Sequence, residues 1–398
     1  MGSAAPLAPV MPCHDPMHGV PKSVLRIPRP SARLTPPLAL LATLGCAADP
    51  AATPPTAPPP VAPPASSVWY TPPITGTAWT TARPAEAGFD STALAAALDW
   101  AMTQNSDAVV ILWRGRLLAE RYAPGVTATT RGPVFSAGKT ITGALVGQLA
   151  AEGRLQLDSS VTRYLGAGWS RMASPALERA ITVRHLLAMA SGLDDSLRTV
   201  APPGARFYYN NPAYYQLFGV LEAAAGQPLS QVAATRLFSR IGMPLALAFP
   251  STDTGEPGFI YTMPAREFAR FGLLVLRHGR WDTTTVLQDS AFLTRARQPS
   301  GTDNPAYGWL WWLNGSASHR TPGPYLLPTN AGPLFPAAPS DLVAALGKDD
   351  KKLYLVPSLD LVLVRLGDRA PISGGISPAA ISTFDNALWT RLMAARLR

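Results

Sequence analysis

Cysteine is nearly absent from this 398-residue sequence, in which Cys13 and Cys46 are the only two and both lie near the start. Residues after position 46 therefore cannot supply a thiol nucleophile, a disulfide or a thiolate metal ligand. Histidine is scarce as well: His185, His278 and His319 lie far apart, without the His-x-x-x-His or Glu-x-x-His spacing of a zinc site. We therefore expect an activity that needs no metal and no other cofactor.

Long apolar runs are also missing, since no segment approaches the roughly 18 uninterrupted apolar residues of a membrane-spanning helix. The apolar run at residues 38–44 is short, follows four basic residues and precedes Gly45 and Cys46; the four are Lys22, Arg26, Arg29 and Arg33. This order is typical of an export signal, which we place at residues 1–46. Gly45-Cys46 resembles a bacterial lipoprotein cleavage site, so two outcomes stay open: membrane attachment through a lipidated Cys46, and release as a periplasmic or secreted protein. A leader without any targeting role is the third interpretation.

Proline is unevenly distributed, with 17 of the 42 prolines in residues 1–66. Residues 47–66 are rich in proline and alanine and predict an extended linker. The body, residues 67–398, has the composition of one packed domain. Its net charge is +7, because the leader holds four of the 34 bases and two of the 25 acids. The arginines are scattered rather than clustered with aromatic residues, so we expect no nucleic-acid partner.

Two β-hairpins near the ends of the body enclose a series of helical patterns. Residues 108–113 and 117–122 predict the first hairpin, and residues 353–356 and 361–366 predict the second. Apolar spacing predicts helices at residues 140–152, 183–190, 214–225 and 267–277, and a closing helix through Leu392. The fold class is therefore α+β: one antiparallel sheet built from both chain ends and flanked by helices, with an inserted, mainly helical lobe.

The strongest chemical signal is Phe135-Ser136-Ala137-Gly138-Lys139, a Ser-x-x-Lys pattern at the start of a helical segment. A spacing of three residues puts both side chains on one helix face, so the lysine amine can reach the serine hydroxyl. Serine is a weak nucleophile until a base removes its proton, and a desolvated amine can serve as that base. Ser136 and Lys139 are therefore candidates for nucleophile and general base.

Lysine usage supports this interpretation. The chain has 29 arginines and five lysines, and Lys139 is the only lysine between Lys22 and Lys348. Arginine does not lose its proton in proteins, so it cannot replace lysine as a base. The alternative to a catalytic pair is a surface lysine beside a serine that caps the helix.

Five segments follow one another along the chain: residues 135–141 around Ser136, 153–158 after its helix, 185–193, 207–211 and 270–274. In this order they resemble the serine β-lactamase and penicillin-recognising superfamily, in its class C-like branch of esterases and 6-aminohexanoate-oligomer hydrolases. The resemblance covers most of residues 85–398. The resemblance implies a β-lactamase/transpeptidase-like fold and an acyl-enzyme mechanism.

In that family the tyrosine of a Tyr-x-Asn motif passes a proton to the leaving group. Both Tyr208 and Tyr209 fit the pattern, and the spacing from Phe207 favours Tyr209. Asn211 would then bind the substrate or orient Lys139. Packing of both tyrosines in the core is the structural alternative.

The family's third motif, Lys-Thr-Gly or His-x-Gly, corresponds here to Ala345-Leu346-Gly347. Alanine in place of the cation weakens recognition of a substrate carboxylate and argues against a β-lactam substrate. The resemblance still assigns an oxyanion hole to the backbone N–H groups of Ser136 and Lys348, next to Gly347. We expect Lys348, Lys351 and Lys352, with Asp349 and Asp350, to form a solvated hairpin rim.

The sequence thus predicts an exported serine hydrolase that cleaves a small-molecule ester or amide. The alternatives are a β-lactamase or D-amino-acid peptidase, and a non-catalytic, envelope-anchored binding domain. The aromatic run at residues 307–312 either walls an acyl pocket or packs two parts of the fold together. His185 is expected to be structural.

Overall fold

The computed structural model describes residues 68–170, 172–251, 258–323, 328–373 and 382–397. The predicted export signal, its Cys46 and the linker at residues 47–66 lie outside these ranges. The described residues belong to one compact unit. Among the described residues, no helix is long and apolar enough to cross a membrane.

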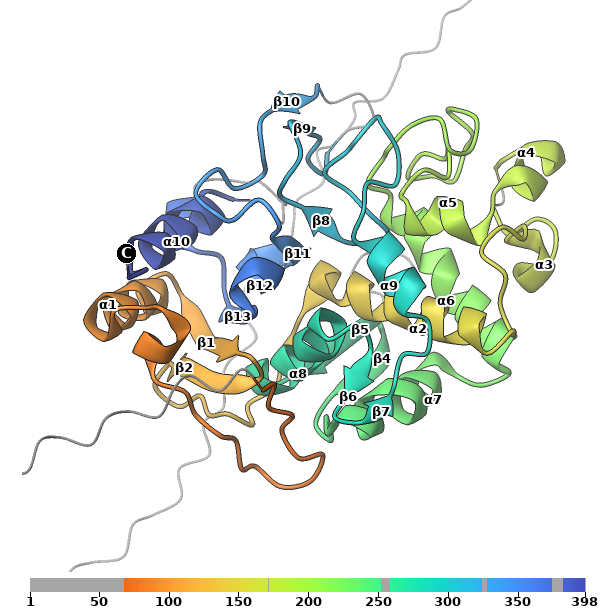
Figure 1. The fold of residues 1–398 in the computed structure, drawn as a ribbon. Helices are drawn as coiled ribbons and strands as arrows, with labels where there is room; N and C mark the ends of the chain where they lie inside the picture. Colours follow the sequence, from red (N-terminus) through yellow and green to blue (C-terminus); the bar gives the residue numbers. More distant parts are fainter. Residues whose placement is uncertain (1–67, 171, 252–257, 324–327, 374–381, 398) are drawn as a thin grey trace, which may run out of the picture. The chain divides into compact units, whose positions relative to one another are not determined.

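A six-stranded antiparallel sheet forms the centre of this unit (Figure 1). Its strand order is β2-β1-β13-β12-β11-β8, so the N-terminal hairpin lies beside the C-terminal strands. The strands are β1 (Ser106–Trp113), β2 (Arg116–Tyr122), β8 (Trp312–Leu313), β11 (Val343–Gly347), β12 (Lys351–Val356) and β13 (Leu361–Gly367). The expected antiparallel sheet from both chain ends is confirmed. β8, at the edge beside β11, was not predicted.

Three small sheets lie outside the central one. The three-stranded sheet has the order β3-β5-β4, formed by β3 (Gly132–Pro133), β4 (Leu247–Ser251) and β5 (Gly258–Met263). The two-stranded sheets pair β6 (Arg280–Trp281) with β7 (Thr284–Thr285), and β9 (Ser318–His319) with β10 (Asn330–Ala331). The first matters most for function, because β3 leads directly into the segment that carries Ser136.

The described part of the chain also contains ten α-helices, besides short 3₁₀- and π-helical segments. They are α1 (Ser91–Met102), α2 (Lys139–Ala151), α3 (Thr162–Leu165), α4 (Pro175–Ala180), α5 (Val183–Leu187), α6 (Asn211–Ala225), α7 (Leu229–Ala233), α8 (Ala265–Leu276), α9 (Ser290–Ala296) and α10 (Thr383–Ala394). The predicted helices correspond to α2, α5, α6, α8 and α10. Their ends differ from the predicted ones by at most three residues, chiefly because caps rather than apolar spacing define where a helix starts.

Opposite faces of the central sheet are covered by different helices. The terminal helices α1 and α10 lie side by side (Figure 1), where Trp100 stacks on Phe384 with ring centroids 5.7 Å apart. Helix α8 packs on the other face, and a Cβ added at its Gly272 would lie 2.7 Å from Leu353 and from Val362. The glycine therefore allows α8 to approach the sheet closely.

Candidate active site

Ser136 lies in a single turn of 3₁₀-helix, η2 (Phe135–Gly138), that leads directly into α2. In a 3₁₀-helix, residues three apart project from the same side, so Ser136 aligns with Lys139. The Ser136 Oγ and the Lys139 Nζ lie 3.0 Å apart, within hydrogen-bonding distance. Phe135, just before the serine, has a φ of 44°, a left-handed conformation that costs energy for a bulky residue and is frequent at active sites.

The Lys139 side chain is buried, with only 5% of its surface exposed. Burial disfavours the charged ammonium and lowers its pKa to about 7. Near neutral pH a large fraction of Lys139 is therefore uncharged and able to accept a proton.

Two tyrosine rings from the α6 region surround this amine. The Nζ lies 4.3 Å from the ring centroid of Tyr214 and 5.2 Å from that of Tyr209. The Tyr214 hydroxyl lies 2.8 Å from the Thr142 Oγ1, and the Tyr261 hydroxyl lies 3.1 Å from the same atom. Our sequence reasoning missed Tyr214, Thr142 and Tyr261. The helical spacing of three residues, from Lys139 to Thr142 and from Asn211 to Tyr214, was the signal available for the first two.

Tyr209 is held by aromatic neighbours. Its ring stacks on Trp312 at a centroid distance of 5.8 Å and meets the edge of Tyr307 at 6.2 Å. Burial raises the pKa of Tyr209 well above its usual value, and a hydrogen bond with Ser136 lowers it by a smaller amount. The Tyr209 hydroxyl thus remains protonated beside Ser136 and Lys139.

Tyr208 is oriented differently. Its hydroxyl donates to the Asp195 Oδ2 over 2.7 Å. The asparagine two residues later, Asn210, is a helix cap: its Oδ1 accepts from Ala213 N, and its Nδ2 donates to the carbonyls of Leu193 and Asp194. The geometry therefore brings Tyr209, rather than Tyr208, to the serine and lysine.

Asn211 is the first residue of α6, on the same helix face as Tyr214 three residues later. The Asn211 Oδ1 is buried and has no hydrogen-bond partner among the described residues. Such an acceptor costs free energy when it remains unpaired. The unpaired Asn211 Oδ1 is therefore suited to accept a hydrogen bond from a bound substrate.

Gly347 ends strand β11 against the turn that carries the serine. A Cβ at this position would lie 2.6 Å from the Val134 carbonyl oxygen and 3.1 Å from the Ala137 amide nitrogen. Only glycine permits this approach of two backbones. Lys348 follows directly, and its exposed amine lies 5.7 Å from the ring centroid of Phe135. Ala345 is buried in the same strand and supplies no charge.

The expected solvated rim is wrong for Lys351, Lys352 and Asp350, which are buried. The Lys352 Nζ lies 2.9 Å from the Asp385 Oδ2 and 3.3 Å from the Asp350 Oδ1. The strand faces the C-terminal helix α10 here, so the charges pair across that interface. The positions of the charged residues within the hairpin do not indicate that Lys352 pairs with Asp385, some 30 residues away.

The aromatic run at residues 307–312 packs the core. Tyr307, Trp309, Trp311 and Trp312 are all buried, with at most 3% of their surface exposed. Two of them, Tyr307 and Trp312, also contact the ring of Tyr209. These buried rings therefore help to hold the Tyr209 ring in the site.

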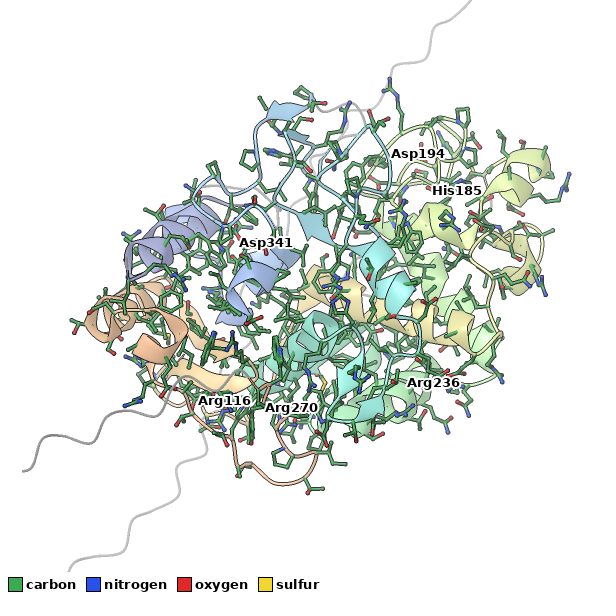
Figure 2. The ribbon with its side chains drawn as sticks, in the orientation of Figure 1. Arg116, His185, Asp194, Arg236, Arg270 and Asp341 are labelled. Carbon is green, nitrogen blue, oxygen red and sulfur yellow. The ribbon has the colours of Figure 1, made fainter. Side chains whose placement is uncertain are left out.

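His185 lies in α5 among the helices at the right of Figure 2. Its Nδ1 accepts from the Thr182 backbone N–H over 3.1 Å, as part of the cap of this helix. This contact fits the structural role expected for His185. Within the described ranges, no group of three or more His, Cys, Asp or Glu side chains is arranged to hold a metal ion.

The family follows from the sequence match. The β-lactamase family model matches residues 94–349, more than half of the chain. The chain belongs to the β-lactamase family. Members of this family are hydrolases, and the matched region includes Ser136, Lys139, Tyr209, Asn211 and Gly347. No curated protein matches the sequence.

Solved structures with the same fold have low sequence identity to this β-lactamase-family chain. A candidate β-lactamase from Bacteroides dorei DSM 17855 has a TM-score of 0.61 and 17% identity, over 77% of this chain and 99% of the other. A candidate 6-aminohexanoate-dimer hydrolase from Bacillus anthracis has a TM-score of 0.55 and 19% identity, over 80% and 86%. EstCE1, a hydrolase with promiscuous acyltransferase activity, has a TM-score of 0.55 and 17% identity, over 77% and 98%. These similarities establish the fold.

Proposed function

We propose that the protein is a serine hydrolase that cleaves a carboxylic ester or amide through an acyl-enzyme on Ser136. The observation that carries the proposal is the 3.0 Å separation of the Ser136 Oγ from a buried Lys139 amine. A nucleophile within hydrogen-bonding distance of a base is the arrangement that covalent catalysis needs.

In the proposed mechanism, neutral Lys139 takes the proton of Ser136 as the hydroxyl oxygen attacks the substrate carbonyl. The backbone N–H groups of Ser136 and Lys348 stabilise the oxyanion, which the close approach of Gly347 to the nucleophile turn supports. Tyr209 passes a proton to the leaving group, and Asn211 binds the substrate or orients Lys139. Water then releases the acyl group by the reverse steps.

A β-lactam or D-amino-acid peptide is the alternative substrate. The geometry favours it less, because β11 carries the buried, neutral Ala345 where the family has a cation or histidine. A simple ester needs no such charge. Small-molecule esters are therefore the first substrates to test.

A fluorophosphonate probe, located by mass spectrometry, tests the proposal on the wild type and on Ser136→Ala. We expect labelling of Ser136 and turnover of p-nitrophenyl acetate or butyrate, both lost in the variant. Rapid nitrocefin turnover would favour the β-lactamase alternative. Labelling without turnover of any substrate would favour a binding domain, and full ester hydrolysis by Ser136→Ala would refute the serine mechanism.

A further inference from the structure

The Lys139 amine has no acidic partner in the described part of the chain. Burial is the sole cause that lowers its pKa, and none of the ion pairs there includes it. When Ser136 gives up its proton to this amine, an ammonium forms in a dry environment. An unpaired buried charge is costly, so something other than a carboxylate must stabilise it.

The ring of Tyr214 occupies the place where such a partner would lie. Its centroid is 4.3 Å from the Nζ, well inside the distance of about 6 Å at which a cation interacts favourably with an aromatic face. The ring of Tyr209 is farther away, at 5.2 Å. Cation–π attraction is strongest where water is excluded, as it is around this buried lysine.

The orientation of the Tyr214 ring is fixed by its surroundings. Its hydroxyl lies 2.8 Å from the Oγ1 of Thr142, one helical turn after Lys139 in α2. The edge of Phe218 contacts it at a centroid distance of 5.1 Å and an interplanar angle of 78°. The hydrogen bond links the Tyr214 hydroxyl to α2, the helix that carries Lys139, whereas the packing of the ring against Phe218 holds its face over the amine.

We propose that Tyr214 is a positioning residue that replaces a carboxylate: its ring face holds the Lys139 ammonium formed during acylation. The inference rests on the proposed function. The proton leaves the Ser136 Oγ for the Nζ, and the freed electron pair of the oxygen forms the bond to the carbonyl carbon. The carbonyl π-electrons move to the oxyanion. When they return, the bond between the carbonyl carbon and the leaving group breaks, Tyr209 gives its proton to the leaving group, and Tyr209 takes back the proton held by Lys139.

An aromatic face suits this task better than an acid would. A neighbouring carboxylate would favour the charged lysine strongly and keep it protonated in the resting enzyme. A ring stabilises the cation less and leaves the site apolar, so a large fraction of the resting amine is neutral near pH 7 and its protonated form is still accessible.

The groups around Lys139 allow its titration to be followed. Within the described part of the chain, its contacts are Ser136 from its own turn and the rings of Tyr209 and Tyr214 from the α6 region. Tyr261 contacts Thr142, and Tyr307 contacts Tyr209, so the next groups outward are also tyrosines. Burial raises the pKa of Tyr209, Tyr214, Tyr261 and Tyr307. These hydroxyls stay neutral between pH 5 and 9, so the acid limb of activity reports on Lys139.

The test compares Tyr214→Leu, which removes the π face, with Tyr214→Phe, which keeps it. The kcat/KM for p-nitrophenyl acetate and the rate of fluorophosphonate labelling are measured from pH 5 to 9. For Tyr214→Leu we expect about a tenfold lower maximum and an acid midpoint about one pH unit below that of the wild type, because the ammonium is less stable. Tyr214→Phe should keep the wild-type midpoint.

Thr142→Val is the matched control, since it breaks the hydrogen bond to Tyr214 and keeps the ring. Its midpoint should also stay near that of the wild type. A Tyr214→Leu profile with the wild-type midpoint would overturn the inference, as would an equal shift in Thr142→Val. If Tyr214→Leu does not fold, Tyr214→Met provides the same comparison. Full activity of Ser136→Ala would instead mean that the proposed function itself has failed.

Discussion

Lys139 and Ser136 lie side by side, with the lysine amine 3.0 Å from the serine oxygen and almost fully shielded from water. Catalysis by this pair requires a lysine that can lose its proton, because only the neutral amine can act as a base. In Lys139→Arg the guanidinium stays protonated and cannot act as a base. We expect turnover of p-nitrophenyl acetate to fall about 10²- to 10⁴-fold, with Ser136→Ala defining the baseline. Wild-type turnover by Lys139→Arg would show that Lys139 is not the base.

The burial of Lys139 determines whether activity should rise or fall with pH. Burial lowers its pKa to about 7, and the neutral form is the one that accepts the serine proton. As pH falls through about 7, Lys139 becomes charged and kcat/KM should drop about tenfold per pH unit. A profile of kcat/KM from pH 5 to 9 measures this. A flat acid limb down to pH 5 would contradict it.

Tyr208 and Tyr209 form a matched pair of variants. Tyr209→Phe removes the hydroxyl beside Ser136, whereas Tyr208→Phe removes one bonded to Asp195. We expect a loss of about 10²-fold or more in kcat for Tyr209→Phe, and activity within about threefold of the wild type for Tyr208→Phe. The reverse order in p-nitrophenyl acetate turnover would assign proton transfer to Tyr208.

Gly347 should tolerate no side chain. In Gly347→Ala the new Cβ would lie 2.6 Å from the Val134 carbonyl oxygen, so strand β11 or the turn with Ser136 must move. We expect at least a tenfold loss in the rate of fluorophosphonate labelling, because the oxyanion donors no longer align. Gly301→Ala is the control, since nothing lies within 4 Å of its added Cβ. Equal labelling rates in the two variants would argue against an oxyanion hole here.

The buried pair of Lys352 and Asp385 should contribute to stability. Asp385 also accepts hydrogen bonds from the Tyr354 hydroxyl and the Ser382 backbone N–H. Asp385→Asn removes the charge that pairs with Lys352 and should lower the free energy of unfolding in urea by about 3 kcal/mol. Asp158→Asn, in an exposed ion pair with Arg184, should lower it by less than about 1 kcal/mol. Similar losses in both variants would show that burial of the pair does not matter.

The class of fold and the central pair of residues could both be predicted from the sequence. Short apolar runs on either side of turn residues predicted β1, β2, β12 and β13. Such runs are continuous in β1, β12 and β13 because these strands are buried on both faces of the sheet. Ser136 and Lys139 were found for a similar reason, since three-residue spacing within one turn is a local relationship. The glycine of β11 was found through its resemblance to a family motif.

Which of the two tyrosines reaches the serine depends on contacts between distant parts of the chain. Tyr208 and Tyr209 are adjacent in the chain, but packing against Tyr307 and Trp312, about 100 residues away, directs Tyr209 to the site. The same holds for Tyr214 over Lys139 and for Lys352 against Asp385. Each contact joins segments that are distant in sequence, and its energy depends on burial, which a pattern of residues along one segment does not encode.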